Sequence, residues 1–275
     1  MPVLRIGHTP DADDAFMYYA IAHGKVAVGE YQVEHVLEDI QTLNQRALVG
    51  ELEGTAISTG VYPMVADKYR IMRVGSSIGR NYGPIVVALD KREGLQLKGA
   101  RIAIPGEYTT AYLLLRLYTE DFDAVPMAFD SIVSAVQQGQ VDAGLLIHEG
   151  QITYASLGLA KILDLGEEWG KDTGLPIPLG LDMVRRDLGE SVASLMAESL
   201  RDSILFAFEH EDEALEYAMQ FSRGIDKETC RRFVRMYVNE DTIDMGDEGQ
   251  QALETLFNKA KDRNIIADLP PIDLI

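Results

Sequence analysis

Side chains that can transfer protons or hold charge stand where short apolar segments of this sequence end. His148 ends the apolar run 143–148, and Ser58 and Thr59 end the run 55–59. An imidazole with an ordinary pKa of about 6.5 suits a general base at neutral pH. Hydroxyl groups can hold negative charge that develops on an oxygen atom. A lone histidine can also be purely structural, so its position at the end of a strand is what favours catalysis.

Three aspartates precede the first helix. Asp11, Asp13 and Asp14 lie within four positions, but Ala15 and Phe16 stand where a calcium loop would need a third oxygen ligand and a glycine. We therefore predict no metal site. Asp11 or Asp13 can cap the helix, and Asp14 complements its positive end. Because the segment forms the first connection from a strand to a helix, we expect one aspartate, Asp14, to face a ligand.

A second helix start follows the strand near residue 104. The helix begins at Thr109 or Thr110, and its first backbone N–H groups offer a place for a carboxylate. Thr109 can equally be a simple N-cap. Arg80, in the glycine-flanked turn "GRNYGP", can bind a carboxylate through two parallel hydrogen bonds or remain a solvated loop residue.

Strands alternate with helices in the first half of the chain, beginning with a strand at 3–7 and a helix that stops at Gly24. Strands joined by helices of this length imply parallel sheets with covered faces. Beyond about residue 188 the pattern changes to helices alone. We expect these helices at 189–210, 212–222, 226–238 and 247–262.

The segment 47–59 is similar to the segment 135–148. Each holds a helix end, a glycine, an apolar strand and then polar side chains. Two such units suggest two lobes, and ligands of parallel sheets sit at the carboxyl ends of the strands. We therefore expect His148, with Tyr154 beside it, to meet Ser58 and Thr59 in one cleft.

The composition limits the class of partner. The 275 residues suffice for two α/β domains, and a formal net charge of −19 disfavours nucleic acid and anionic membranes as partners. A small anionic ligand would need local donors. No apolar run reaches the roughly 20 residues of a membrane helix. With no visible export signal and one cysteine, Cys230, we expect a cytoplasmic protein.

The segment "LLIHEGQITYASLGLAKILDLGEEWGKDTGLPIPLG" at 145–180 resembles the signature of the 1,4-dihydroxy-6-naphthoate synthase family, of the futalosine pathway of menaquinone biosynthesis. Supporting matches are "PDADDAFMYYAIAHGKV", "LEDIQTLNQRA", "AISTGVYP" and "GRNYGPIVVA". The resemblance extends in register over roughly residues 5 to 185, whereas the helical tail matches only in character.

The resemblance implies an α/β fold of the type II periplasmic-binding-protein kind. It has two lobes, each with a mostly parallel sheet flanked by helices, two crossover strands at a hinge and a helical C-terminal region. The crossovers are expected near residues 88–92 and 177–182. Lobe 1 is then discontinuous, with residues 1–90 and 180–275, and lobe 2 holds residues 91–179.

The resemblance also implies a lyase reaction without cofactor or metal. Cyclic de-hypoxanthine futalosine, a small anionic carboxylate, is split to the naphthoate and a sugar-derived fragment. The family's catalytic base falls on His148. Its ligand-binding positions fall on Asp14, Ser58, Thr59, Thr109, Thr110 and the backbone of Ala111. Monomer and homodimer both stay open.

One departure from the family concerns the opening segment. Many members read Cys-Pro-Asn-Asp-Thr-Phe where this chain has Asp11 to Phe16, so a related branch with a modified substrate is an open alternative. Two other functions fit the same fold: a solute-binding protein without chemistry, which would carry an export signal or lipid anchor, and the sister chorismate dehydratase.

Overall fold

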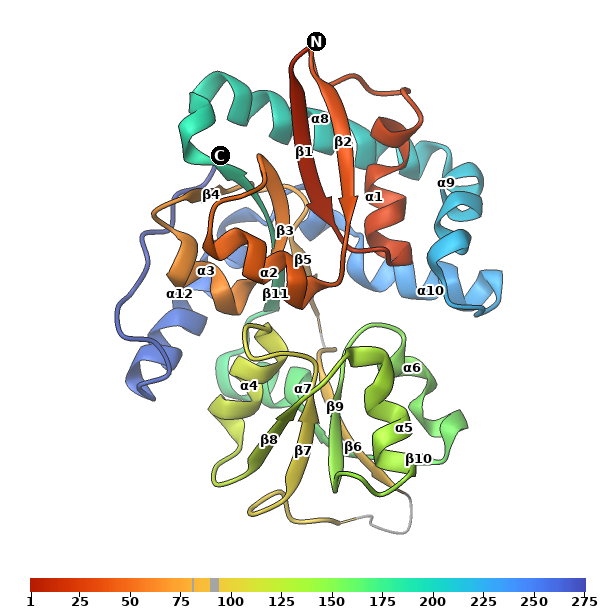
Figure 1. Ribbon diagram of the computed structural model, residues 1–275, viewed down its shortest axis with the longest axis vertical. Helices are drawn as coiled ribbons and strands as arrows, with labels where there is room; N and C mark the ends of the chain where they lie inside the picture. Colours follow the sequence, from red (N-terminus) through yellow and green to blue (C-terminus); the bar gives the residue numbers. More distant parts are fainter. Residues whose placement is uncertain (81, 90–93) are drawn as a thin grey trace. The chain divides into compact units, whose positions relative to one another are not determined.

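The computed structural model describes residues 1–80, 82–89 and 94–275. The chain divides into two compact units, each described by itself below (Figure 1). The first unit holds Met1–Ile78, Gly180–Gln250 and Pro270–Ile275, and the second holds Gly79–Leu179 and Gln251–Leu269.

A six-stranded sheet forms the centre of the first unit. Its strand order is β2 (Gln32–Leu37), β1 (Val3–His8), β3 (Gly54–Ser58), β11 (Ile177–Arg185) and β4 (Tyr69–Ile71), and β5 (Ser77–Gly79) pairs with β11. The expected parallel pairing holds for β1 with β2 and with β3. It does not hold for β11, which runs antiparallel to β3 and β4. The reason is that the chain passes through the second unit between β3 and β11, so these strands are not joined by the single crossover helix that connects parallel neighbours.

Helices account for most of the rest of the first unit. They are α1 (Ala12–Ala22), α2 (Ile40–Leu48), α3 (Tyr62–Val65), α8 (Gly189–Glu209), α9 (Glu211–Ala218), α10 (Lys227–Tyr237), α11 (Glu240–Ile243) and the start of α12 (Gly246–Asp262). The predicted all-helical region is therefore confirmed. Helix α1 is buried along nearly its whole length because it packs against α8, α9 and α10. None of the helices within the described ranges has the length and apolarity needed to cross a membrane.

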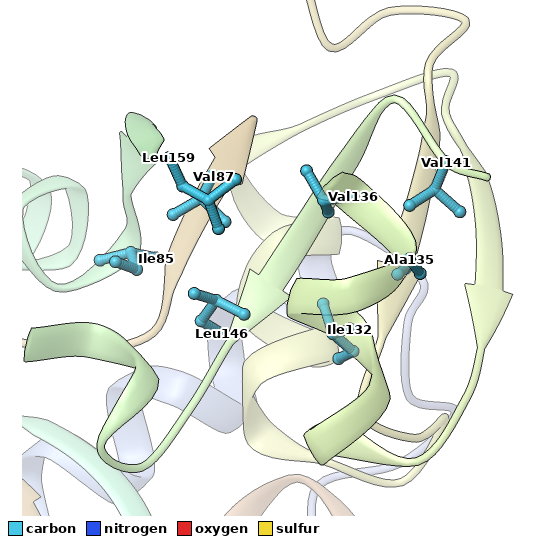
Figure 2. Close-up of a cluster of buried hydrophobic side chains, with 9 residues drawn as sticks. Ile85, Val87, Ile132, Ala135, Val136, Val141, Leu146 and Leu159 are labelled. Carbon is cyan, nitrogen blue, oxygen red and sulfur yellow. The ribbon is translucent and has the colours of Figure 1, made fainter. Parts of the chain in front are cut away.

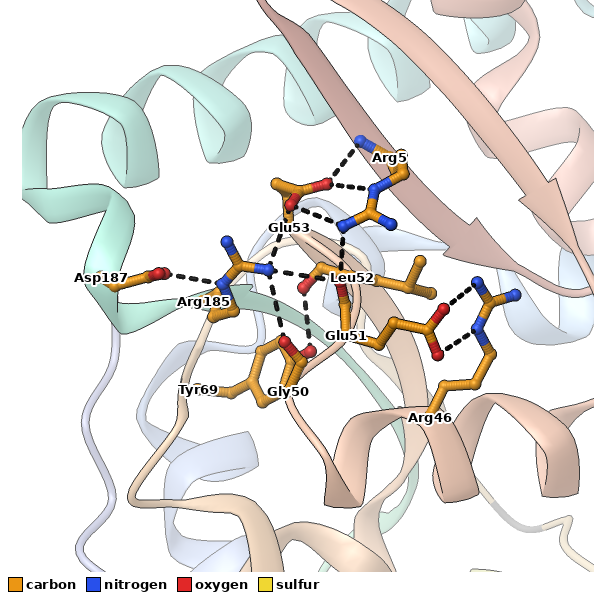
Figure 3. Close-up of polar contacts among 9 residues, drawn as sticks. All are labelled: Arg5, Arg46, Gly50, Glu51, Leu52, Glu53, Tyr69, Arg185 and Asp187. Carbon is orange, nitrogen blue, oxygen red and sulfur yellow. Dashed lines mark hydrogen bonds and ion pairs between the residues drawn. The ribbon is translucent and has the colours of Figure 1, made fainter.

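Ion pairs fix the amino end of β3 (Figure 3). Glu53 directly precedes the strand, and its carboxylate accepts from Arg5 Nε at 2.9 Å and from Arg185 Nη1 at 3.0 Å. The Tyr69 hydroxyl donates to the carbonyl of Leu52 at 2.9 Å. These contacts join β1, β3, β4 and β11, so the register of β3, and hence the position of its carboxyl end, is set from the opposite edge.

The second unit holds a five-stranded mixed sheet. Its order is β10 (Leu159–Asp164), β6 (Ile85–Leu89), β9 (Ala143–Leu146), β7 (Arg101–Ile104) and β8 (Asp123–Pro126). Strand β7 is parallel to β8 and β9, whereas β6 is antiparallel to β9 and β10. The helices are α4 (Thr110–Tyr118), α5 (Ile132–Gln137), α6 (Gly150–Thr153) and α7 (Leu165–Thr173).

Apolar side chains of β6, β9 and α5 form a core on one face of this sheet (Figure 2). Val87 of β6 and Leu146 of β9 pack with Ile132 of α5. Gly144 allows the close approach of α5 to β9, because a Cβ atom there would lie 2.5 Å from Ile132. Burial of such side chains stabilises a fold by roughly 1.5–3 kcal/mol each.

The limits of the units differ from the predicted lobes at two places. Residues 79–80 and 82–89, placed in lobe 1 from the sequence, pack with the second unit because β6 is an inner strand of its sheet. The segment 251–269 also packs there, and Lys259 forms an ion pair with Asp172 of α7 at 2.7 Å. The predicted limit between residues 90 and 91, and most of the crossover at 88–92, lie outside the described residues.

Candidate active site

The carboxyl edge of the first sheet gathers three of the predicted residues. Strands β1 and β3 are parallel, with Ile6 opposite Gly54, so both end at the same edge. Helix α1, which carries Asp14 in its first turn, follows β1, and Ser58 and Thr59 follow the same edge at the end of β3. Figure 1 shows β1 and β3 running in the same direction within this unit.

Asp14 is bound to the loop that precedes its own helix. Its Oδ2 atom accepts hydrogen bonds from the backbone N–H of Thr9 at 2.6 Å and from Thr9 Oγ1 at 2.9 Å. The carboxylate is buried. Two donors on one oxygen hold the side chain in a single orientation, as a binding residue requires.

The predicted capping of α1 by Asp11 is wrong. Asp11 occupies the N-cap position, but its side chain makes no capping hydrogen bond. Its carboxylate instead forms a short ion pair with the guanidinium of Arg223, a residue 212 positions away. A guanidinium satisfies a buried carboxylate more fully than neutral amide donors do, which explains the change. Asp13 lies within the first turn of the helix.

Ser58 is held by Asn44, a residue that was not predicted to be part of the site. The backbone N–H of Ser58 donates to Asn44 Oδ1 at 2.8 Å, and Asn44 Nδ2 donates to Ser58 Oγ at 3.0 Å. Asn44 is completely buried in α2. Its polar side chain between the buried Leu43 and Ala47 was a usable signal, since a buried amide needs partners.

Thr59 is also buried, and its Oγ1 atom has no hydrogen-bond partner among residues 1–80, 82–89 and 94–275. Buried hydroxyl groups nearly always have a partner. An unsatisfied hydroxyl at the end of β3 therefore points to a group that binds there.

A buried hydrogen bond lies behind this edge. Tyr18, one turn after Asp14 on α1, donates its hydroxyl to Asp182 Oδ1 of β11 at 2.9 Å. Burial raises the pKa of the Asp182 carboxyl well above its ordinary value, and the charge of nearby Asp14 raises it further. Asp182 therefore favours its neutral form. Gly75 packs against it: a Cβ there would lie 2.2 Å from Asp182 Oδ2, and its φ of +84° also favours glycine.

Two histidines form a neutral pair beside Tyr18. His8 Nδ1 lies 3.3 Å from the carbonyl of Thr9, and His8 Nε2 lies 2.9 Å from His35 Nδ1. Because a carbonyl only accepts, Nδ1 of His8 carries the hydrogen and Nε2 accepts from His35. Burial, reinforced by His35, lowers the pKa of His8 to about 3. The His8 ring stacks on Tyr18 with centroids 4.3 Å apart.

The carboxyl edge of the second sheet gathers four more predicted residues. Strands β7 and β9 are parallel, with Ile102 opposite Ala143, so the start of α4 and the segment at His148 follow the same edge. Thr109 caps α4 by accepting from Tyr112 N–H at 3.2 Å. The Thr110 hydroxyl donates to the Leu179 carbonyl at 2.6 Å.

Ala111 is the second residue of α4 and is buried. With the Thr110 hydroxyl already donating to a carbonyl, the backbone N–H groups of this turn are the donors best suited to an anion.

His148 has an unusual backbone conformation. Its φ is +52°, in the left-handed region that non-glycine residues rarely adopt. The ring is half-buried and meets the edge of Phe129, with centroids 5.1 Å apart. The residue stands two positions after β9 and just before α6, where Gln151 N–H donates to its carbonyl at 3.1 Å. Such outliers concentrate at functional sites.

Tyr154 and Arg80 are the two remaining residues that were predicted to bind the ligand. Tyr154 begins a 3₁₀ helix (Tyr154–Leu157) and packs against the apolar cluster of Figure 2. Arg80 is exposed directly after β5. Contact of either with a ligand stays a prediction. In the described part of the chain, no group of three or more His, Cys, Asp or Glu side chains is arranged to hold a metal ion.

Solved structures share this architecture. A protein from Archaeoglobus fulgidus is 52% identical, with a TM-score of 0.93 and coverage of 96% of this chain and 98% of the other. A Candida albicans protein described as having the generic periplasmic binding protein fold is 13% identical, with a TM-score of 0.74 and coverage of 98% and 92%. This second likeness shows the fold alone, and it confirms the fold class expected from the sequence.

Sequence relatives are similar over nearly the whole chain. A family model described as menaquinone biosynthesis matches residues 4–262. The 1,4-dihydroxy-6-naphthoate synthase of Thermus thermophilus is 42% identical over 270 residues, which cover 98% of each chain. The enzyme of the same name from Streptomyces coelicolor is 36% identical over 274 residues, covering 98% of this chain and 96% of the relative. The chain therefore belongs to the menaquinone biosynthesis family that contains the 1,4-dihydroxy-6-naphthoate synthases.

Proposed function

We propose that this protein is a lyase that converts cyclic de-hypoxanthine futalosine to 1,4-dihydroxy-6-naphthoate without a cofactor, with His148 as the general base. The observation that carries the proposal is the geometry of His148. A half-buried imidazole on a left-handed residue follows the carboxyl end of β9, at the same sheet edge as the start of α4. Family membership supports the reaction, and the geometry supports the base.

The start of α4 supplies the anion site in this proposal. The helix is capped by Thr109, and the backbone N–H groups of its first turn, up to Ala111, bind the carboxylate of the substrate. Arg80, exposed after β5, is the alternative carboxylate partner. A fixed carboxylate would orient the ring system relative to His148, which stands at the same sheet edge.

Ser58 and Thr59 bind oxygen atoms of the substrate on which negative charge develops. Asn44 donates to Ser58 Oγ, so the hydrogen of the Ser58 hydroxyl is directed to another acceptor. The Thr59 hydroxyl is buried without a partner in the described residues. Two such donors would stabilise an oxyanion that forms during the reaction.

The chemistry asked of the protein is modest. His148 removes a proton next to the departing sugar carbon, and the electron pair of that C–H bond forms a double bond of the second ring. The sugar-derived fragment leaves with the electrons of the bond that breaks and takes up a proton, and aromatisation of the second ring drives the reaction. The protein positions the substrate, accepts the proton and excludes water. The cytoplasmic location and the oligomeric state expected from the sequence stay predictions.

The decisive experiment is to incubate the purified protein with cyclic de-hypoxanthine futalosine, without added metal or nucleotide, and to follow the naphthoate chromophore. Appearance of 1,4-dihydroxy-6-naphthoate supports the proposal. Tight binding of the substrate without product would favour a solute-binding protein. Consumption of chorismate in a parallel reaction would favour the chorismate dehydratase. Either result would contradict the assignment.

A further inference from the structure

An ion pair at the carboxyl edge of the first sheet has no part in the function proposed above. Asp11, directly before α1, pairs with Arg223, which lies between a 3₁₀ helix (Met219–Phe221) and α10. The carboxylate side chain is 2% exposed, whereas the arginine side chain is 37% exposed. The guanidinium thus covers a buried carboxylate from the solvent side of this edge.

Stability alone does not explain this pair. Arg223 has a φ of +52°, a left-handed conformation that costs an L-residue roughly 1–2 kcal/mol and that glycine adopts more easily. A buried ion pair is also often no more stable than an apolar pair of similar volume. An arginine in this strained position, paired with a buried aspartate, indicates that the guanidinium has a role on the solvent side of the pair.

The turn that carries Arg223 is fixed. Ser222 is buried and its hydroxyl donates to the Met219 carbonyl at 2.9 Å. After the turn, Asp226 caps α10 by accepting from Glu228 N–H at 3.0 Å. Helix α1 packs against both the 3₁₀ helix and α10. The guanidinium is therefore presented from a rigid segment, as recognition of a small ligand requires.

The charges and hydrogen-bonding groups at this edge indicate which chemical group of a ligand would bind here. Arg223 is a donor, Asp11 and Asp14 are acceptors, and the Thr59 hydroxyl at the same edge lacks a partner within the described ranges. A carboxylate would be repelled by the aspartates at the start of α1. A hydroxyl group both donates and accepts, so neighbouring hydroxyls match such a set of donors and acceptors without adding charge.

We propose that Arg223 binds the hydroxyl groups of the sugar-derived part of the substrate, and that Asp11 is the positioning residue that holds the guanidinium in place. This inference rests on the proposed function, because it assigns one end of that substrate. It separates the two ends: the sugar-derived end binds at Arg223, and the aromatic carboxylate binds elsewhere. The affinity of a ligand without the sugar-derived part should not change when Arg223 is replaced.

The test compares two ligands on four proteins: wild type, Arg223→Gln, the double variant Asp11→Asn/Arg223→Gln and the control Arg231→Gln. Arg231 suits as control because its side chain is 35% exposed and is ion-paired to Glu228 at 2.9 Å. For Arg223→Gln we expect the KM for cyclic de-hypoxanthine futalosine to rise about tenfold, as loss of a hydrogen bond from a charged group implies, with little change in kcat. The affinity for 1,4-dihydroxy-6-naphthoate should stay unchanged.

The double variant separates binding from folding. It removes both charges, so its melting temperature should return toward that of wild type, while its KM stays raised. A double variant with the wild-type KM would overturn the proposal, and so would an equal loss of naphthoate affinity. If wild type binds the substrate without turnover, the proposed reaction is wrong. The dissociation constant of the substrate, measured by calorimetry on the same variants, then tests whether Arg223 binds the sugar-derived part.

Discussion

Buried side chains fix the polar groups at the sheet edge of the first unit, whereas the histidine at the edge of the second unit depends on a turn. Ser58 is bound by Asn44 through its backbone N–H and its Oγ atom, and one carboxylate oxygen of Asp14 accepts two hydrogen bonds from Thr9. His148 is half-buried, has a left-handed backbone and touches the ring of Phe129. These side chains therefore differ in burial and in backbone conformation.

This difference suits two separate roles in the proposed reaction, the binding of oxygen atoms and the transfer of a proton. Groups that bind oxygen atoms must have donors in place before the ligand arrives, and a buried scaffold provides this. A base must carry and release a proton, which needs contact with solvent or substrate. In the proposed function the first unit binds oxygen atoms of the substrate and the second transfers the proton. Four predictions test these roles, beginning with the one expected to change activity most.

The largest effect is expected at the second edge. Replacement His148→Ala should lower turnover by about a hundredfold or more while leaving substrate affinity nearly unchanged, because a base acts in the transition state. Steady-state kinetics and calorimetric binding measure the two quantities. The exposed His210 at the end of α8 provides the matched control His210→Ala, which should keep full turnover. Unchanged turnover in His148→Ala would remove the histidine from the mechanism.

The second effect concerns the scaffold of the first edge. Asn44→Ala leaves the buried backbone N–H of Ser58 without its partner, so the free energy of unfolding should fall by about 1–3 kcal/mol and KM should rise. Chemical denaturation and kinetics measure these effects. Gln45→Ala, one position later and exposed on the same helix, should change neither. A variant with lower stability but wild-type KM would show that Asn44 only supports the fold.

The third effect is a pH dependence of stability in the first unit. His8 has a folded pKa of about 3, below its unfolded value of about 6.5, so the unfolded chain binds the extra proton. Stability therefore falls as the pH drops from about 6.5 toward 3, by about 2 kcal/mol between pH 7 and pH 5. Burial lowers the pKa of His35 too, which acts in the same direction.

The variant His8→Gln stays neutral and should lose most of this dependence. Urea denaturation at pH 5 and pH 7 gives the comparison, and His210→Gln, whose ring is exposed at a helix end, should behave as wild type. An equal loss of stability on acidification in His8→Gln and wild type would contradict the buried, neutral state of His8.

Much of this architecture could be predicted from the sequence, because hydrophobic periodicity is a local property. The strand at 3–7, the helix of the opening segment and the helical region after residue 188 all follow from it. The antiparallel direction of β11 could not be read in this way, since pairing depends on where the chain re-enters the sheet. Hydrophobic periodicity predicts where helices and strands lie, but it does not predict which strands pair or in which direction.

Candidate residues of the site could be chosen from the sequence where a polar side chain ends a strand or begins a helix. His148, Ser58 and Thr109 were chosen in this way, and their contact with a ligand stays a prediction. Asn44 gave a signal of its own, but its contact with Ser58, 14 positions away, and the contact of Asp11 with Arg223, 212 positions away, required the fold. The departure of the opening segment from the family pattern was visible, but its consequence, an aspartate bound by a distant arginine, required the fold.

The smallest effect is expected at the start of α4. It tests whether this helix start is held in place for the ligand by its cap, as Ser58 and Asp14 are held by their hydrogen bonds in the first unit. Thr109→Ala removes the cap on Tyr112 N–H and should cost about 1 kcal/mol of unfolding free energy, with a modest rise in KM. Thr109→Ser keeps the cap and should restore both quantities. If Thr109→Ala lowers stability and leaves KM unchanged, the helix start serves the fold only, and the carboxylate must be bound by another group, of which the exposed Arg80 is the first to test.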